Sequence, residues 1–234
     1  MNLQPLDNIV WHCLTGAHAG FARGSAGARR YGPGFSPIVG FASAQAPDLA
    51  ALAPYCEPGE PLYCAGWSGA SPAGWAIEEE ASMAQMLWRG APPADDIALP
   101  AVRLGLAHLA AVLELVALTQ PGPFGPRTIE LGDYYGVFED GRLVAMAGER
   151  MSAGRLREIS AVCTHPEFQG RGLARRLVAK LLRLQVGRGQ LPFLHVVDEN
   201  AHARRLYERM GFVHHQDLVV RVVTRVPSPT SAKP

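Results

Sequence analysis

The pattern of apolar and polar positions is regular only in the part of the chain that follows residue 97. There, apolar residues recur at helical spacing in three segments, and the shorter stretches between them have the character of strands. The predicted helices are Leu106–Thr119, Gly172–Val186 and Asn200–Met210, and the predicted strands are Ala98–Leu104, Asp133–Glu139, Arg142–Met151, Leu156–Thr164, Phe193–Val197 and Val213–Val226. This order predicts an α/β domain over residues 98–226, a mixed sheet with helices on both faces.

Residues 1–97 show weaker periodicity and are rich in Gly, Pro and Ala. They predict a short helix at Pro47–Tyr55, a strand at Pro61–Ala65, and a strand or helix start at Ile77–Trp88. The Pro and Asp content of Gly90–Asp96 is typical of a connector. We therefore predict a smaller N-terminal α/β region at 1–97, and a disordered tail at 227–234.

The composition is that of a globular protein, with 234 residues, 48% of them hydrophobic and 18% charged. No run of about 18 apolar residues is present, and the N-terminus lacks the pattern of a signal peptide. We therefore expect a cytoplasmic protein that does not bind membranes. The four cysteines show no metal-like spacing, which predicts reduced, mostly buried thiols and no metal site; they are Cys13, Cys56, Cys64 and Cys163.

Charge is distributed unevenly along the chain, although the formal net charge is only +1. Residues 1–97 carry 4 Arg against 9 acidic residues, whereas residues 98–234 carry 18 basic against 12 acidic residues. This asymmetry favours an anionic ligand in the second part of the chain. Nucleic acid is not expected as that ligand, because the basic residues are not interleaved with aromatic residues and form no basic tail.

The segment from Val162 to Arg175 has the features of an anion site. A strand ends near Pro166, a loop with Gly170 and Gly172 follows, and a helix begins. The first turn of a helix has unpaired N–H groups and the positive end of the helix dipole, and Arg171, Arg175 and Arg176 would add positive charge. A plain strand-to-helix turn is the alternative. The loop is neither G-x-G-x-x-G nor a Walker-type phosphate loop.

Two motifs in this part of the chain resemble the GNAT superfamily of N-acetyltransferases. Gln169-Gly-Arg-Gly-Leu-Ala174 is similar to that family's Q/R-x-x-G-x-G/A pyrophosphate loop. Further on, Asn200, Tyr207 and Gly211-Phe212 match the N-x₆-Y-x₃-G-F element. The resemblance covers residues 98–226 approximately. Residues 1–97 are interpreted as a region that helps to shape an acceptor pocket, or as a divergent half of the same fold.

The resemblance implies an acetyl-CoA-dependent enzyme and a set of coenzyme-binding residues. Backbone groups of Val162, Cys163 and Thr164 would bind the pantetheine arm, to which Asn200 would also bond. The pyrophosphate would lie on the loop formed by Gln169, Gly170, Arg171, Gly172, Leu173, Ala174 and Arg175. Tyr207 would be the proton donor to the leaving thiolate. Without the resemblance, Asn200 is interpreted as a helix cap and Tyr207 as a core residue.

The reaction also needs a proton acceptor, because the attacking amine must be neutral. Glu158 is the first candidate, since some members of the family carry a catalytic Glu on this strand. Strand alternation predicts that Glu158 shares a face with Val162 and Thr164, and that Cys163 lies on the opposite face in the core. The structural alternative for Glu158 is a solvated carboxylate paired with Arg155 or Arg157. His195 is the alternative base.

The predicted function is direct transfer of an acetyl group from acetyl-CoA to a primary amine, without a covalent enzyme intermediate. The acceptor would be a small molecule or a protein amine, and the protein a monomer or a homodimer. The alternative function is a non-catalytic acyl-CoA-binding regulatory domain with the same fold. The presence of both Tyr207 and Glu158 favours the enzyme.

Overall fold

The computed structural model describes residues 3–226 and divides into two compact units. The first unit contains the residues up to Pro33, Pro37–Met83 and the residues from Asp217 on. The second contains Gly34–Ser36 and Ala84–Gln216. The division differs from the boundary predicted after residue 97, because the long strands β5 (Trp75–Trp88) and β11 (Phe212–Arg225) each contribute residues to both units. The role of residues 1–97 stays a prediction.

The second unit contains a mixed sheet in which the neighbouring strands follow the order β11-β5-β10-β9-β8-β7-β6. The strands not yet given bounds are β6 (Ala101–Leu104), β7 (Tyr134–Glu139), β8 (Arg142–Ala153), β9 (Leu156–Thr164) and β10 (Leu191–Val197). Strands β6 to β9 pair antiparallel, whereas β9 and β10 pair parallel. Strands β7 and β8 form a hairpin, with Asp140 and Gly141 at φ values of 50° and 78° in its turn.

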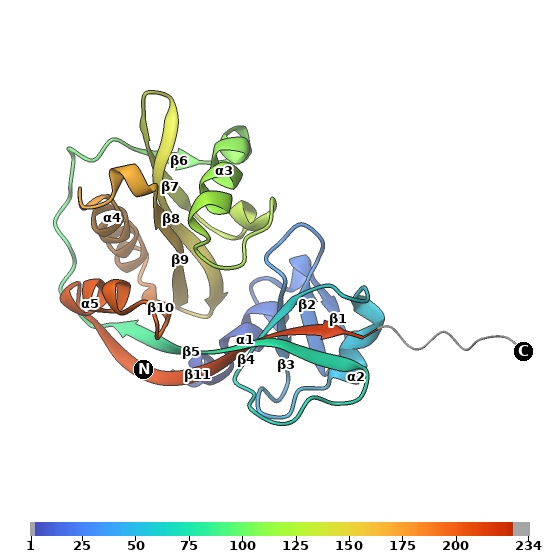
Figure 1. The fold of residues 1–234 in the computed structure, drawn as a ribbon. Coiled ribbons are helices and arrows are strands. Elements are labelled where there is room, and N and C mark those ends of the chain that lie inside the picture. Colours follow the sequence, from blue (N-terminus) through green and yellow to red (C-terminus); the bar gives the residue numbers. More distant parts are fainter. Residues whose placement is uncertain (1–2, 227–234) are drawn as a thin grey trace, which may run out of the picture. The chain divides into compact units, whose positions relative to one another are not determined.

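Helices cover both faces of this sheet, as the sequence predicts (Figure 1). Leu177 and Leu181 of α4 (Leu173–Gly187) and Tyr207 of α5 (Ala201–Arg209) belong to the core on one face. Val112 and Leu115 of α3 (Leu109–Thr119) belong to a separate core on the other face. Short 3₁₀ turns complete the unit at Leu106–His108, Thr128–Leu131 and Pro166–Phe168.

The first unit has its own strands and its own core. Its strand order is β1-β2-β3-β4-β11-β5, with β1 at Ala22–Gly24, β2 at Ala28–Tyr31, β3 at Ile38–Phe41 and β4 at Leu62–Ala65. Its helical segments are Gln4–Asn8, α1 (Ile9–Thr15), Ala19–Phe21, α2 (Leu49–Leu52) and Ala53–Tyr55. Phe41, Leu52, Leu62 and Val223 lie in its core. Helix α1 and strands β1 to β3 are not among the predicted elements, because a helix of seven residues and strands of three or four are too short to show a clear period.

Strand β9 contains an irregularity that corrects one prediction. Ser160 pairs with Gly148 and Cys163 with Met146, so β9 has one residue more than β8 in this interval, and Ala161 has a φ of 51°. Ile159 and Val162 consequently contact the core beneath α4, while Ala161 and Cys163 contact the core beneath α3. The prediction that Glu158 shares a face with Val162 and Thr164, opposite Cys163, is therefore wrong. Cys163 is buried, as expected.

Other compositional predictions can be compared with the structure directly. All four cysteines are buried free thiols. Across residues 3–226, no helix is both long and apolar enough to cross a bilayer, and no group of three or more His, Cys, Asp or Glu side chains is arranged to hold a metal ion. The predicted tail at 227–234 lies outside the described residues.

Candidate functional site

Strands β9 and β10 separate towards their carboxyl ends. Their parallel pairing runs from Leu191 opposite Leu156 to Phe193 opposite Glu158, and both strands continue beyond that pair. Within the described part of the chain, the edge of β9 that faces β10 therefore has no strand partner at Val162–Thr164. The hydroxyl of Thr164 is also buried without a hydrogen-bond partner among residues 3–226. Unsatisfied polar groups at this place fit a ligand that offers amide donors and acceptors.

The loop that follows β9 leads into the N-terminus of α4. Gly170 and Gly172 have φ values of 77° and 74°, a conformation that side chains disfavour, and a Cβ atom at either position would meet nothing within 4 Å. Among residues 3–226, the first backbone N–H of the helix that donates to a carbonyl is that of Arg176, which lies 3.1 Å from the Gly172 oxygen. The preceding N–H groups of the first turn are thus available to an anion.

The arginines around this loop are not equivalent. Arg176 donates to Asp96, with Nη2 3.0 Å from Oδ1, so its charge is already balanced. Arg171 stacks on Phe168, 4.7 Å from the ring centroid, and reaches Glu139 at 3.1 Å, although half of its side chain is exposed. Arg175 is exposed. The basic rim predicted from the sequence therefore consists mainly of Arg171 and Arg175.

The two predicted residues of α5 have different surroundings. Asn200 caps the helix, since its Oδ1 accepts a hydrogen bond from the Ala203 N–H at 3.0 Å. Tyr207 is only 7% exposed, and its ring packs edge-on against Phe212 with the centroids 5.8 Å apart. Burial and the nearby Cys163 raise the pKa of Tyr207 to about 12. The phenol is therefore protonated at neutral pH and lies close to β9.

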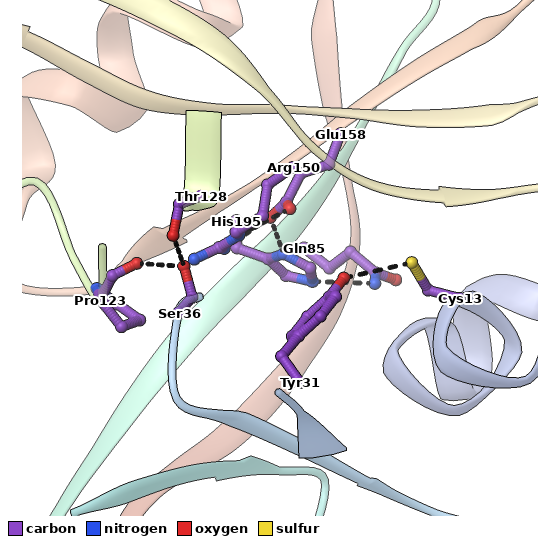
Figure 2. A network of polar contacts seen from close by, with 9 residues as sticks. All are labelled: Cys13, Tyr31, Ser36, Gln85, Pro123, Thr128, Arg150, Glu158 and His195. Carbon is purple, nitrogen blue, oxygen red and sulfur yellow. Dashed lines mark hydrogen bonds and ion pairs between the residues drawn. The ribbon is translucent and has the colours of Figure 1, made fainter. Parts of the chain in front are cut away.

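Glu158 is buried and held by two partners. Arg150 of β8 donates to both carboxylate oxygens, at 3.0 Å and 2.8 Å, and His195 Nδ1 lies 2.8 Å from Oε1 (Figure 2). Burial by itself would raise the pKa of Glu158, but the charge of Arg150 and the hydrogen bonds lower it to about 2. The alternative interpretation of Glu158, a solvated carboxylate paired with Arg155 or Arg157, is wrong. Arg155 instead donates to the Gly189 carbonyl, and Arg157 forms an ion pair with Glu149.

His195 extends this contact into a longer polar chain. Its Nε2 lies 3.0 Å from Gln85 Nε2, and Gln85 Oε1 accepts from Gln216 Nε2 at 3.0 Å. The structure thus brings together the two candidate bases, Glu158 and His195. Three residues of this chain of contacts are not among the predicted site residues: Arg150, Gln85 and Gln216. No sequence signal marks them, because their strands are neighbours in the sheet but far apart along the chain.

Comparison with known proteins adds independent information. The model of the family described as FR47-like protein matches residues 134–221. A solved structure of a GNAT-family protein from Novosphingobium aromaticivorans DSM 12444 is 35% identical, covers 95% of this chain and 99% of its own, and superposes with a TM-score of 0.88. A GNAT-family acetyltransferase from Colwellia psychrerythraea is similar in fold alone, with 12% identity, a TM-score of 0.51, and coverage of 70% of this chain and 65% of its own.

One curated relative is similar over a shorter segment. The mycothiol acetyltransferase of Acidimicrobium ferrooxidans is 42% identical over 96 residues, which is 38% of this chain. The match spans only 30% of the length of that relative.

Proposed function

Because this chain belongs to the GNAT family of acetyltransferases, we propose that it transfers an acetyl group from acetyl-CoA directly to a primary amine. The observation that supports this best is the separation of β9 from β10 beside the open, glycine-lined N-terminus of α4. An extended anionic cosubstrate fits between such strands, with its phosphates at the helix N-terminus. When bound, acetyl-CoA supplies an activated thioester.

The proposed coenzyme site uses backbone groups more than side chains. Val162, Cys163 and Thr164 would bind the pantetheine arm along the free edge of β9, where the unpaired Thr164 hydroxyl adds one more polar contact. Gln169–Arg175 would surround the pyrophosphate, and Arg171 and Arg175 would add charge. Asn200 already caps α5 through Oδ1, so its amide nitrogen is the group it could offer to the coenzyme.

Tyr207 is the proposed proton donor to the departing sulfur. With a pKa of about 12, it holds its proton at neutral pH and is therefore present as a donor when the thiolate departs. Its low exposure limits exchange of that proton with water. Tyr207 also packs in the core beneath α4 and α5, as the alternative interpretation of this residue predicts. The two roles are compatible.

The proton of the amine has two candidate acceptors. Glu158 has both oxygens bound to Arg150 and His195, and a carboxylate with a pKa of about 2 is a weak base at neutral pH. His195 has an imidazole nitrogen, Nε2, that faces only the Gln85 amide among the contacts described above, and imidazole is the side chain that most often serves as a general base. We therefore assign the proton to His195, and Glu158 becomes the group that orients the imidazole ring.

An acceptor screen tests the function. Thiol release from acetyl-CoA is followed with small amines, amino acids, polyamines, protein amines and the acceptor of the mycothiol acetyltransferase relative. Amine-dependent thiol release would support the enzyme. Coenzyme A binding in calorimetry without thiol release with any amine would instead favour the non-catalytic acyl-CoA-binding domain.

A further inference from the structure

Five polar side chains form one hydrogen-bonded chain across five neighbouring strands of the sheet. They are Gln216 of β11, Gln85 of β5, His195 of β10, Glu158 of β9 and Arg150 of β8. Each contact lies between 2.8 Å and 3.0 Å. Figure 2 shows the Gln85, His195, Glu158 and Arg150 side chains pointing towards one another. One residue from each strand is a regular arrangement that packing alone does not require.

At the Arg150 end, the chemistry of the groups fixes the direction of each hydrogen bond, and at the other end the orientation of the Gln85 and Gln216 amides sets it. A guanidinium only donates, so Glu158 accepts from Arg150 and is ionised. An ionised carboxylate only accepts, so His195 must carry a proton on Nδ1. At the other end, Gln216 donates to the Gln85 carbonyl oxygen. The amide nitrogen of Gln85 therefore faces His195 Nε2 as a donor, and Nε2 must be unprotonated.

We propose that Gln85, oriented by Gln216, is a positioning residue that keeps His195 neutral with its lone pair on Nε2. This inference rests on the proposed function, in which His195 accepts the proton of the amine. A proton on Nε2 would face the N–H groups of Gln85, so the amide opposes protonation of the ring. Glu158 alone would favour protonation, but its charge is balanced by Arg150. The incoming amine takes the place of the Gln85 amide at His195 Nε2. As the amine attacks, one N–H bond of the amine breaks and an Nε2–H bond forms on His195. Water later removes this proton from His195.

The charged and titratable groups around His195 are consistent with this assignment. Glu158 and Arg150 face it from β9 and β8. Tyr134 of β7 is close to both of them, and burial raises its pKa above the usual value, so it stays neutral. The Tyr134 hydroxyl has no hydrogen-bond partner in the described part of the chain and does not compete for the His195 nitrogens.

The decisive variant is Gln85→Glu, which replaces the donor at Nε2 with an acceptor that carries a negative charge. Nuclear magnetic resonance of the imidazole nitrogens, with His195→Gln for assignment, reports the tautomer and the titration of His195 in the free protein. In the wild type at pH 7, we expect Nδ1 protonated and Nε2 unprotonated. In Gln85→Glu, the titration midpoint should rise by at least about one pH unit, as expected for a new opposite charge at hydrogen-bond distance.

The matched control is Gln120→Glu, the same change at an exposed position after α3, which should leave the midpoint unchanged. A second variant, Gln216→Leu, lets the Gln85 amide rotate and should give a mixture of both His195 tautomers. If Gln85→Glu does not fold, Gln216→Leu carries the test. With an acceptor in hand, the acid limb of kcat/KM should shift upward in Gln85→Glu, lowering kcat/KM at pH 6 about tenfold.

A wild-type His195 protonated on Nε2, or a midpoint in Gln85→Glu equal to that of Gln120→Glu, would overturn the inference. The spectra need neither coenzyme nor acceptor, so their outcome does not depend on activity. If no amine is acetylated but His195 is protonated on Nδ1, the proposed function is wrong, whereas the inferred hydrogen bonds around His195 are supported. If the protein acetylates an amine but its His195 is protonated on Nε2, the proposed function is supported and the positioning role of Gln85 is wrong.

Discussion

Gly148 of β8 lies directly beneath the ring of Tyr134 of β7. The two residues are opposite each other in the antiparallel pair, and a Cβ atom at position 148 would lie 2.0 Å from Cδ1 of the tyrosine ring. Tyr134 is 1% exposed and has no space to move. The missing side chain at Gly148 therefore allows an aromatic ring to lie flat on the sheet beside the Arg150–Glu158 pair.

Gly148→Ala should destabilise the protein by overpacking this contact. Forcing an extra methyl group into a closed core typically costs about 1–3 kcal/mol. Urea unfolding measures the change. The control is Gly187→Ala at the end of α4, where nothing lies within 4 Å of the added atom and alanine is the better helix former. Equal unfolding midpoints for the two variants would contradict the packing argument.

Gly172→Asp should weaken coenzyme A binding, because the carboxylate would face the pyrophosphate at the N-terminus of α4. The binding free energy should drop by more than about 1.4 kcal/mol, a tenfold loss of affinity in calorimetry. Gly189→Asp is the matched control: its φ is 70°, against 74° at Gly172, and it has equally open space at the other end of the helix. Both variants should lose similar stability, because both place a side chain at a positive φ. Equal affinities of the two variants for coenzyme A would therefore contradict the assignment of the anion site to this loop.

Glu158 should make the stability of the protein dependent on pH in the acid range. Its pKa is about 2 in the folded protein, below the ordinary value of 4.5. A lowered pKa stabilises the fold above the unfolded value, so the contribution is complete above pH 4.5 and is lost as the pH falls towards 2. The full loss should be about 3 kcal/mol, and roughly 2 kcal/mol of it should occur above pH 3. Urea unfolding between pH 7 and pH 3 measures it.

Two variants isolate this effect. Glu158→Gln removes the charge that compensates Arg150 and should cost about 3–5 kcal/mol at pH 7, while flattening the acid dependence. Glu130→Gln removes an exposed carboxylate paired with Arg127 and should change little. An acid dependence that is the same in Glu158→Gln and in the wild type would show that other carboxylates are responsible.

Tyr207→Phe should lower turnover with little effect on coenzyme A binding. The ring and its contact with Phe212 remain, and only the acidic hydroxyl is lost. General acid catalysis contributes about 10²–10⁴-fold, so the loss should fall in that range if the chemical step limits turnover. Tyr135→Phe is the control, because it removes the hydroxyl of another tyrosine, which lies on β7. Wild-type turnover in Tyr207→Phe, together with a solvent isotope effect in the wild type, would return Tyr207 to a purely structural role.

The fragment 1–97 should not unfold cooperatively. Strand β4 pairs with residues of β11, with Val220 opposite Ala65 and Val223 opposite Leu62, and Val223 is fully buried in the core of the first unit. A fragment that ends at residue 97 lacks this strand and exposes that core. Circular dichroism during urea unfolding tests it; a sharp transition in the fragment would show that β11 is dispensable.

Long periodic elements and local motifs could be predicted from the sequence, whereas the pairing between distant segments could not. The leucines of α4 and the alternation of β9 identified those elements with nearly correct bounds. The bulge at Ala161 could not be foreseen, because alanine rarely adopts a positive φ and the extra residue depends on the pairing with β8. The assumption of unbroken alternation therefore placed Glu158 on the wrong face.

The same limit explains the incomplete site. The helix N-terminus and its glycines are local features, and their spacing is visible in the sequence. Gln85, Arg150 and Gln216 reach His195 and Glu158 only because β11, β5, β10, β9 and β8 are neighbours in an order unlike that of the chain. Short strands in the first unit, such as β1 with three residues, give too few positions for a period to appear.

Strand β11 is synthesised after the other described strands, although part of it belongs to the unit that also contains β1 to β4. At about 5–20 residues per second, roughly 7–30 s pass on the ribosome between Met83 and Arg225. During that interval, β4 has an open edge where β11 will pair, and an open edge is a template for pairing with other chains. Slow translation of this message therefore lengthens the time in which the nascent protein is exposed to aggregation.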